Sequence, residues 1–139
     1  MSYREHAAIY EHLGMWPRRI RPGTKACYDK GWNKPNTDLP SGTLQRWLDT
    51  RGNFGIGLLM GSPISDGTRL GALDVDRNEY TALGRTLLRN PICGRFGQKG
   101  AVFFVRVRGN LGNPEFYGSG PEGKKWGKVA ECLFTKSSA

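Results

Sequence analysis

Two aspartates separated by one residue, Asp74 and Asp76, have the types and spacing that could bind a divalent metal ion. Asp74-Val75-Asp76 ends a predicted strand, and the two-residue period of a strand puts both carboxylates on the same face. Carboxylates that close repel each other, so both stay ionised only when a cation lies between or beside them. Mg²⁺ or Mn²⁺ would fill that role with oxygen ligands. The alternative is structural, because acids at strand ends also cap helices and a predicted helix starts at Asn78.

A third acid, Glu131, strengthens the metal hypothesis. It lies inside the apolar stretch 128–134, where an unpaired charge in a central strand is costly. Metal coordination would relieve that cost, and so would an ion pair with Arg106; the sequence leaves both open. Asp74, Asp76 and Glu131 on adjacent strands could hold two metal ions roughly 4 Å apart, the usual arrangement for in-line phosphoryl transfer. They are our candidate catalytic and metal-binding residues.

Between these acids lies a glycine-rich basic segment, residues 94–100, that reads Gly-Arg-Phe-Gly-Gln-Lys-Gly. Its backbone N–H groups, with Arg95, Gln98 and Lys99, could bind the phosphates of a nucleotide. The segment matches neither a Walker A loop nor G-x-G-x-x-G, and hairpin loops are often rich in Gly and Lys, so a purely structural turn is the alternative. Arg106 is equally suited to a phosphate clamp and to a structural ion pair.

The charge distribution favours a polyanionic partner. Lys and Arg number 21 against 12 acids, a net charge of +9, and no acid occurs from Tyr80 to Pro114. A second basic stretch lies near the N-terminus and provides candidate nucleic-acid-binding residues: Arg18, Arg19, Arg21 and Lys25. The alternative is the solvated basic face of a soluble protein.

Hydrophobic spacing predicts alternating helices and strands. A capping box at Ser2 and Glu5 starts a helix that ends near Gly14, and further helices follow Ser41 and Asn78. Strands are predicted over residues 16–20, 54–60, 70–76, 101–108, 115–117 and 128–134. The pattern indicates an α/β protein of the α+β type, with flanking helices on a mixed β-sheet whose short links favour antiparallel neighbours.

Length and composition limit the function classes. The 139 residues suit one domain, no apolar run is long enough to span a bilayer, and no secretory signal is visible, so we expect a cytoplasmic protein without a membrane partner. Three scattered cysteines indicate neither a disulfide framework nor a zinc site. Both histidines, His6 and His12, fall in the first predicted helix, which gives no support for a Ser/His/Asp or Cys/His catalytic arrangement.

The order of these motifs resembles the N-terminal domain of bifunctional DNA primase/polymerases, of the archaeo-eukaryotic primase superfamily found in phages and plasmids. The resemblance covers about residues 16–134. It is carried by an ordered series: Lys25, Gly31-Trp32, Thr37-Asp38, a helix with Trp47, Asn53-Phe54-Gly55-Ile56-Gly57 and Leu73-Asp74-Val75-Asp76.

The resemblance implies an αβ module over residues 1–68 and an RRM-like metal-binding half over residues 69–139. It also implies template-directed synthesis from nucleoside triphosphates with Mg²⁺ or Mn²⁺. Asp74 and Asp76 match the first metal motif, and Glu131 falls where the third is expected. The second motif ends in a nucleotide-contacting histidine, and here Val102 stands at that place, so Lys99 or Gln98 would substitute. Family domains also continue past the third acid, which implies further chain beyond Ala139.

Our hypothesis is therefore a primase–polymerase core that binds a single-stranded DNA template and nucleoside triphosphates and works with a helicase domain or protein. Because of Val102 and the short C-terminus, we expect this chain to bind metal and nucleotide but to polymerise slowly by itself. The first alternative is a primase-like module that binds nucleic acid with weak or no catalysis. The second is a D-x-D nucleotide-sugar transferase, which the charge of +9 does not call for.

Overall fold

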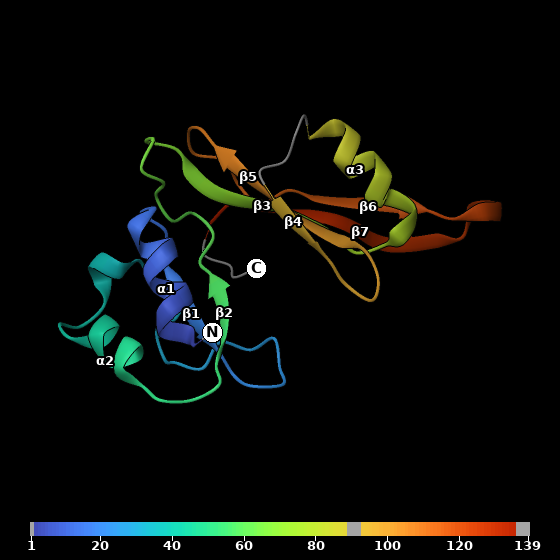
Figure 1. Cartoon of the computed structure of the whole chain (residues 1–139). Helices are drawn as coiled ribbons and strands as arrows, with labels where there is room; N and C mark the ends of the chain where they lie inside the picture. The colour runs from blue at the N-terminus through green and yellow to red at the C-terminus, as the bar shows by residue number, and fades with distance from the viewer. Residues whose placement is uncertain (1, 89–92, 136–139) are drawn as a thin grey trace.

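A computed structural model of the chain describes residues 2–88 and 93–135. These residues form a two-stranded and a five-stranded sheet with three α-helices, so the α+β class expected from the sequence is confirmed (Figure 1). Every described strand pairing is antiparallel, and the expected mixed sheet is not formed. Hairpins join β4 to β5 and β6 to β7, and the crossover through α3 places β4 beyond β5, so β3 and β4 run in the same direction without being neighbours.

The N-terminal part packs two helices against a short ribbon of two strands. Its elements are α1 (Tyr3–His12), β1 (Pro17–Ile20), the 3₁₀ helix η1 (Asn36–Asp38), α2 (Thr43–Asp49) and β2 (Gly55–Leu58). The predicted capping box starts α1, since the Ser2 side chain accepts from the Glu5 N–H and the Glu5 carboxylate accepts from the Ser2 N–H. Helix α2 begins later than predicted: Gly42 rather than Ser41 precedes it, at a φ of 75°. Tyr3, Ala7 and Trp47 form the core between the two helices.

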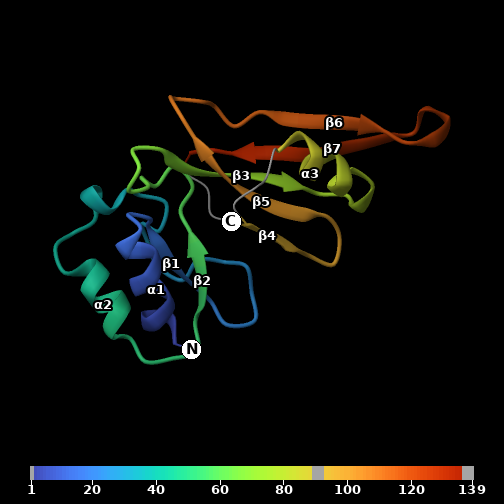
Figure 2. The ribbon, with the colours of Figure 1, turned by 45° about the horizontal axis from the view of Figure 1, so that its top comes forward.

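The C-terminal part is the five-stranded sheet, in the order β4-β5-β3-β7-β6 (Figure 2). Its elements are β3 (Arg69–Val75), η2 (Asn78–Tyr80), α3 (Thr81–Leu87), β4 (Cys93–Phe96), β5 (Ala101–Val107), β6 (Glu115–Ser119), η3 (Pro121–Gly123) and β7 (Lys125–Leu133). Strand β4 was not predicted from the sequence; its residues were assigned to a glycine-rich turn. Strands β6 and β7 form a long hairpin at one edge.

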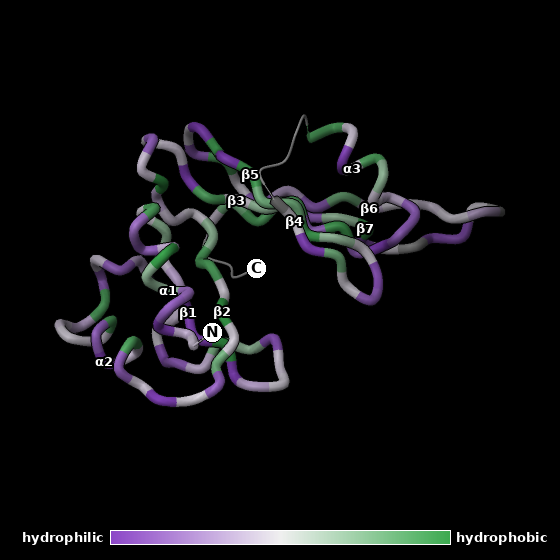
Figure 3. Tube along the Cα trace, in the orientation of Figure 1, coloured by the Kyte–Doolittle hydropathy of each residue, from purple (hydrophilic) through white to green (hydrophobic). Residues whose placement is uncertain are grey.

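The two faces of this sheet have different coverings. Helix α3 packs on one face, where Gly84 lies against Leu73, Val75 and Phe103. The opposite face turns toward the N-terminal part: Leu70, Ala72 and Val102 share a core cluster with Leu58, Met60 and Ile64. Figure 3 shows hydrophobic residues along the central strands and mainly hydrophilic ones in the loop before α2.

Within the described residues, no helix combines the length and the apolar character that a membrane crossing requires.

Candidate functional site

A single row of side chains crosses all five strands on the face that turns toward the N-terminal part. The register sets Arg95 opposite Val102, Val102 opposite Asp74, Asp74 opposite Glu131, and Glu131 opposite Glu115. Directly opposed residues of antiparallel strands point to the same face, with Cβ atoms about 5 Å apart. The row therefore runs from a cation through an apolar side chain to three carboxylates, and Asp76 lies on the same face one strand period beyond Asp74.

The electrostatic centre of the row is Asp74. Burial raises the pKa of its carboxyl group above the ordinary value, and the negative charges of Asp76 and Glu131 raise it further. Arg95 and Lys128 act in the opposite direction on the same pKa, by charge attraction. Because burial and neighbouring carboxylates destabilise the ionised form of Asp74, a nearby cation would stabilise that form.

Lys128 provides a cation next to Glu131 that the sequence did not reveal. Its Nζ lies 2.8 Å from Glu131 Oε1 and 3.8 Å from Glu115 Oε1. Residues three apart on a regular strand point to opposite faces, but a register shift near residue 129 breaks the alternation. The hydrogen bond to Glu131 raises the pKa of Lys128, and the charges of Glu115 and Asp76 add to the effect. Of the two possibilities that the sequence left open for Glu131, the ion pair with Arg106 is not formed, and Glu131 pairs with Lys128 instead.

The carboxylates meet some requirements of a metal site and lack one. Across the described ranges 2–88 and 93–135, no three His, Cys, Asp or Glu side chains are gathered closely enough to hold one ion. Asp76 Oδ2, however, is buried without a hydrogen-bond partner among the described residues. Asp74, Asp76 and Glu131 offer the hard oxygen atoms that Mg²⁺ and Mn²⁺ bind. In this structure the Glu131 carboxylate is instead paired with Lys128.

Two cavities meet at Asp74, and both are lined by Lys25, Asp74 and Arg95. One, of about 390 Å³, extends along the β4–β5 turn and includes Gln98 and Lys99. The other, of about 370 Å³, extends toward the glycine-rich strand β2 of the N-terminal part. The predicted phosphate-binding residues Arg95, Gln98 and Lys99 therefore do lie beside Asp74, and Lys25, which we had assigned to the template, lies with them.

Gly100, the last glycine of the β4–β5 turn, packs closely against the end of β3. Gly100 has a φ of 75°, and a Cβ atom on it would lie 1.7 Å from the Val75 carbonyl oxygen. The Gly100 N–H donates to Asn78 Oδ1 over 2.6 Å. Asn78, predicted as a helix cap, thus instead ties the glycine-rich turn to the segment that follows Asp76. This contact fixes the cationic turn relative to the acids.

Arg106 does not join this cluster. It lies opposite Leu70, four strand residues from the position opposite Asp74, and its Nη1 is 2.6 Å from Asp66 Oδ2. Of the two roles that the sequence left open, the structural ion pair is the one formed. Assigning Arg106 to a nucleotide is therefore not supported by its position.

Arg18 is buried and donates a hydrogen bond from each of its three guanidinium nitrogens. Its side chain is 0% exposed and donates to the carbonyls of Pro17, Trp32 and Lys34 and to Asn36 Oδ1. Burial lowers the pKa of its guanidinium to about 10, but this value is still far enough above 7 for the group to stay protonated at neutral pH. The structure therefore does not present Arg18 to a nucleic acid, contrary to our expectation.

Arg19 is likewise held inside the N-terminal part. It forms a bidentate ion pair with Asp29, and its guanidinium lies over the rings of Tyr28 and Phe54 at 4.9 and 5.0 Å. These partners hold the guanidinium away from a template strand. Of the basic stretch, only Arg21 and Lys25 are exposed. Nothing in the sequence separates the four, because burial of a cation depends on partners far along the chain.

Val102 is 7% exposed and forms the apolar floor between Arg95 and Asp74. Its neighbours in the core cluster include Leu58, Met60 and Ala72. In this structure Val102 therefore belongs to the hydrophobic core.

The chain matches no protein-family model and no curated protein sequence. The resemblance to primase/polymerases therefore rests on the motifs themselves.

Proposed function

We propose that this chain is the core of a metal-dependent nucleotidyl transferase of the DNA primase/polymerase type, which copies a single-stranded DNA template from nucleoside triphosphates. The observation that carries the proposal is the row from Arg95 to Glu115, with a pair of cavities meeting at Asp74. Such a row would bring the phosphates of a nucleotide, held by cations, next to acids that can bind metal.

The order of the strands supports the RRM-like half that the resemblance implies. The chain runs β3-α3-β4-β5, with β5 inserted between β3 and β4 and β7 on the other side of β3. This is the order of a split β-α-β unit. Where such a unit has a second helix, this chain has β6 in a hairpin with β7.

The exposed cations beside Asp74 have separate roles in this proposal. Lys99 and Gln98, on the β4–β5 turn, bind the outer phosphates, and Arg95 and Lys25 bind the phosphate next to Asp74. Each hydrogen bond between such a cation and a phosphate oxygen contributes about 1.5–3 kcal/mol. Arg21, which is exposed, contacts the template in this proposal.

Asp74, Asp76 and Glu131 would hold the divalent ions. When bound, such an ion supplies charge neutralisation and Lewis-acid activation at a phosphoryl group. The protein's own contribution is to keep Asp74 half-buried and to release Glu131 from Lys128 as the ion arrives. Lys128, released from Glu131, would keep Glu115 as a neighbour, with its Nζ 3.8 Å from Glu115 Oε1.

One observation favours a second function, that of a primase-like module that binds nucleic acid without catalysis. The Lys128–Glu131 ion pair already neutralises one of the three metal-binding acids. In that function Lys128 permanently takes the place of a metal ion, and the cations of the cleft bind the phosphates of a single strand.

Primer extension on a single-stranded DNA template tests the proposal. The expected result is slow incorporation that needs Mn²⁺ or Mg²⁺ and stops with a chelator. Template affinity that does not change with metal concentration, together with no incorporation at any metal concentration, would instead support the non-catalytic nucleic-acid-binding module.

A further inference from the structure

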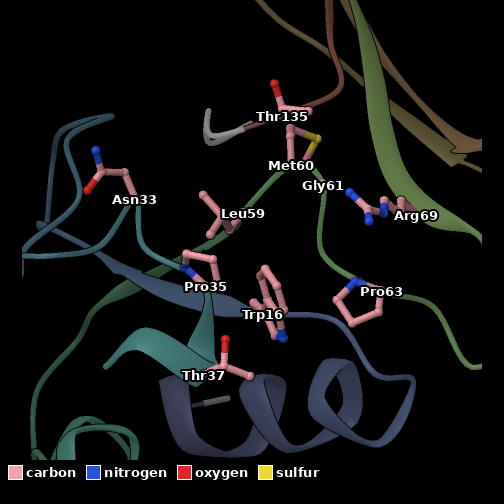
Figure 4. A pocket seen from close by; sticks show the side chains of 10 residues that line it. All are labelled: Trp16, Asn33, Pro35, Thr37, Leu59, Met60, Gly61, Pro63, Arg69 and Thr135. Atoms are coloured by element: carbon pink, nitrogen blue, oxygen red, sulfur yellow. The ribbon is translucent and has the colours of Figure 1, made fainter. Parts of the chain in front are cut away.

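A third cavity, separate from the two beside Asp74, lies where the N-terminal part meets the start of β3 (Figure 4). It measures about 450 Å³ and is larger than either cavity beside Asp74. Arg69, which borders it, precedes Asp74 by five residues on β3, roughly 17 Å along the strand. The cavity is therefore not part of the acid row.

Its walls combine an aromatic and apolar floor with one charged group. Trp16, Leu59, Met60 and Pro63 supply the apolar surface, and Leu59 and Met60 are buried. Figure 4 shows Trp16 between Pro63 and the loop that precedes α2, with Arg69 on the Pro63 side. Arg69 is the charged lining residue, and it is exposed with no ion-pair partner among the described residues.

We propose that this cavity takes one base of a single-stranded nucleic acid, with an adjoining phosphate on Arg69. A base is a planar ring that gains from an aromatic surface, and every base has such a face. A volume of about 450 Å³ is ample for one base with its sugar. The proposal shares its ligand with the proposed function but uses a different site.

A strand, rather than a free nucleotide, suits the charges at the rim. Exposed Lys34 lies on the loop between the lining residues Asn33 and Pro35, and Figure 4 shows Asn33 across the cavity from Arg69. Cations on both sides bind the phosphates before and after the inserted base. The net charge of +9 attracts such a strand over a longer range.

The test is binding of a fluorescently labelled oligothymidylate, followed by anisotropy over a range of salt concentrations. Trp16→Leu should weaken binding about tenfold at one salt concentration, since a lost base stack costs that order. Arg69→Gln should reduce the slope of log affinity against log salt by about 0.7, the loss of one phosphate contact on a single strand. Arg51→Gln, which removes another exposed arginine, on the loop before β2, is the matched control and should weaken binding less.

Wild-type affinity and salt slope in both Trp16→Leu and Arg69→Gln would overturn the proposal. So would binding of thymidine monophosphate that depends on Arg69 when the oligonucleotide shows no such dependence, because the cavity would then be a small-molecule site. Metal-dependent incorporation should be lost in Asp74→Asn, whereas the base site is tested by the oligothymidylate binding of Trp16→Leu and Arg69→Gln. Failure of the base site and failure of the proposed function are therefore read from different variants.

Discussion

Asp74 on β3 lies directly opposite Glu131 on β7, so two carboxylates lie side by side on one face at the centre of the sheet. Side chains so placed interact across the strands, and like charges there destabilise the pair. Burial and the charges of Asp76 and Glu131 raise the pKa of Asp74, which means that folding makes its carboxyl group bind a proton more tightly than in the unfolded chain. The apo protein therefore tolerates a repulsion that a bound cation would remove.

The pH dependence of stability follows from that raised pKa. A carboxyl group with a higher pKa in the folded state binds more protons folded than unfolded, so stability falls as pH rises from about 4, the ordinary value, through the folded pKa. Asp74→Asn should therefore raise the melting temperature of the apo protein at pH 7 and have little effect at pH 3. Thermal unfolding at both pH values measures this. An Asp74→Asn protein that melts below wild type at pH 7 would contradict it.

If the proposed metal site is correct, Lys128 should compete with the ion for Glu131. Lys128→Met should increase the thermal stabilisation that Mn²⁺ gives, because the ion no longer has to displace the ammonium that lies 2.8 Å from Glu131. The apo variant should be less stable than wild type, since a half-buried carboxylate loses its partner. Exposed Lys124 provides the control, and Lys124→Met should leave the Mn²⁺ response unchanged. If Mn²⁺ stabilises both variants to the same extent, Lys128 does not compete with the ion for Glu131.

The glycine-rich turn depends on Gly100. Gly100→Ala should lower the free energy of unfolding by about 2–4 kcal/mol, because a Cβ atom would meet the Val75 carbonyl oxygen. Gly67→Ala isolates the clash from the backbone strain: Gly67 has a φ of 81° with open space around it, so its cost should be only about 1–2 kcal/mol. Urea unfolding of the two variants gives the difference. Equal losses would show that the turn moves freely away from β3.

Arg18 and Arg21 should separate structure from binding. Arg18→Met leaves several buried carbonyl groups without a donor and should cost about 3 kcal/mol or more in unfolding free energy. Exposed Arg21→Gln should change stability by less than about 0.5 kcal/mol and reduce the salt slope of oligonucleotide binding by about 0.7. Denaturant unfolding and anisotropy measure the two effects. A stable Arg18→Met protein with weakened binding would reverse the assignment.

Local signals in the sequence were enough for the elements that depend on local chemistry. The capping box at Ser2 fixes α1, and the strand period placed Asp74 and Asp76 on one face with Val75 in the core. Relationships between distant segments were not accessible in this way. The register shift near residue 129 turns Lys128 toward Glu131, and a shift of that kind leaves no signature in residue types.

The basic residues illustrate the same limit. Arg18, Arg19, Arg21 and Lys25 look alike in the sequence, yet two are buried with partners and Lys25 lines both cavities beside Asp74. Whether each of these cations is buried or exposed depends on contacts with the loop around Asp29 and Trp32 and with the five-stranded sheet. Residue composition does not reveal those contacts. Strand β4 was missed because glycines at 94 and 97 leave only a short stretch without a clear alternation of apolar and polar residues. The strand is recognisable from its pairing with β5.

Template-directed incorporation of a single nucleotide by carboxylate variants tests the central claim most directly. Wild type and Asp49→Asn, which changes an exposed aspartate of α2, should both add the nucleotide complementary to the template base when Mn²⁺ is present. Asp74→Asn, Asp76→Asn and Glu131→Gln should each lower the rate at least 100-fold while they keep the fold and the binding of the template, since a lost metal ligand removes charge stabilisation at the phosphoryl group. Incorporation that persists in the three site variants, or that Asp49→Asn abolishes equally, would contradict a metal-dependent centre at Asp74, Asp76 and Glu131.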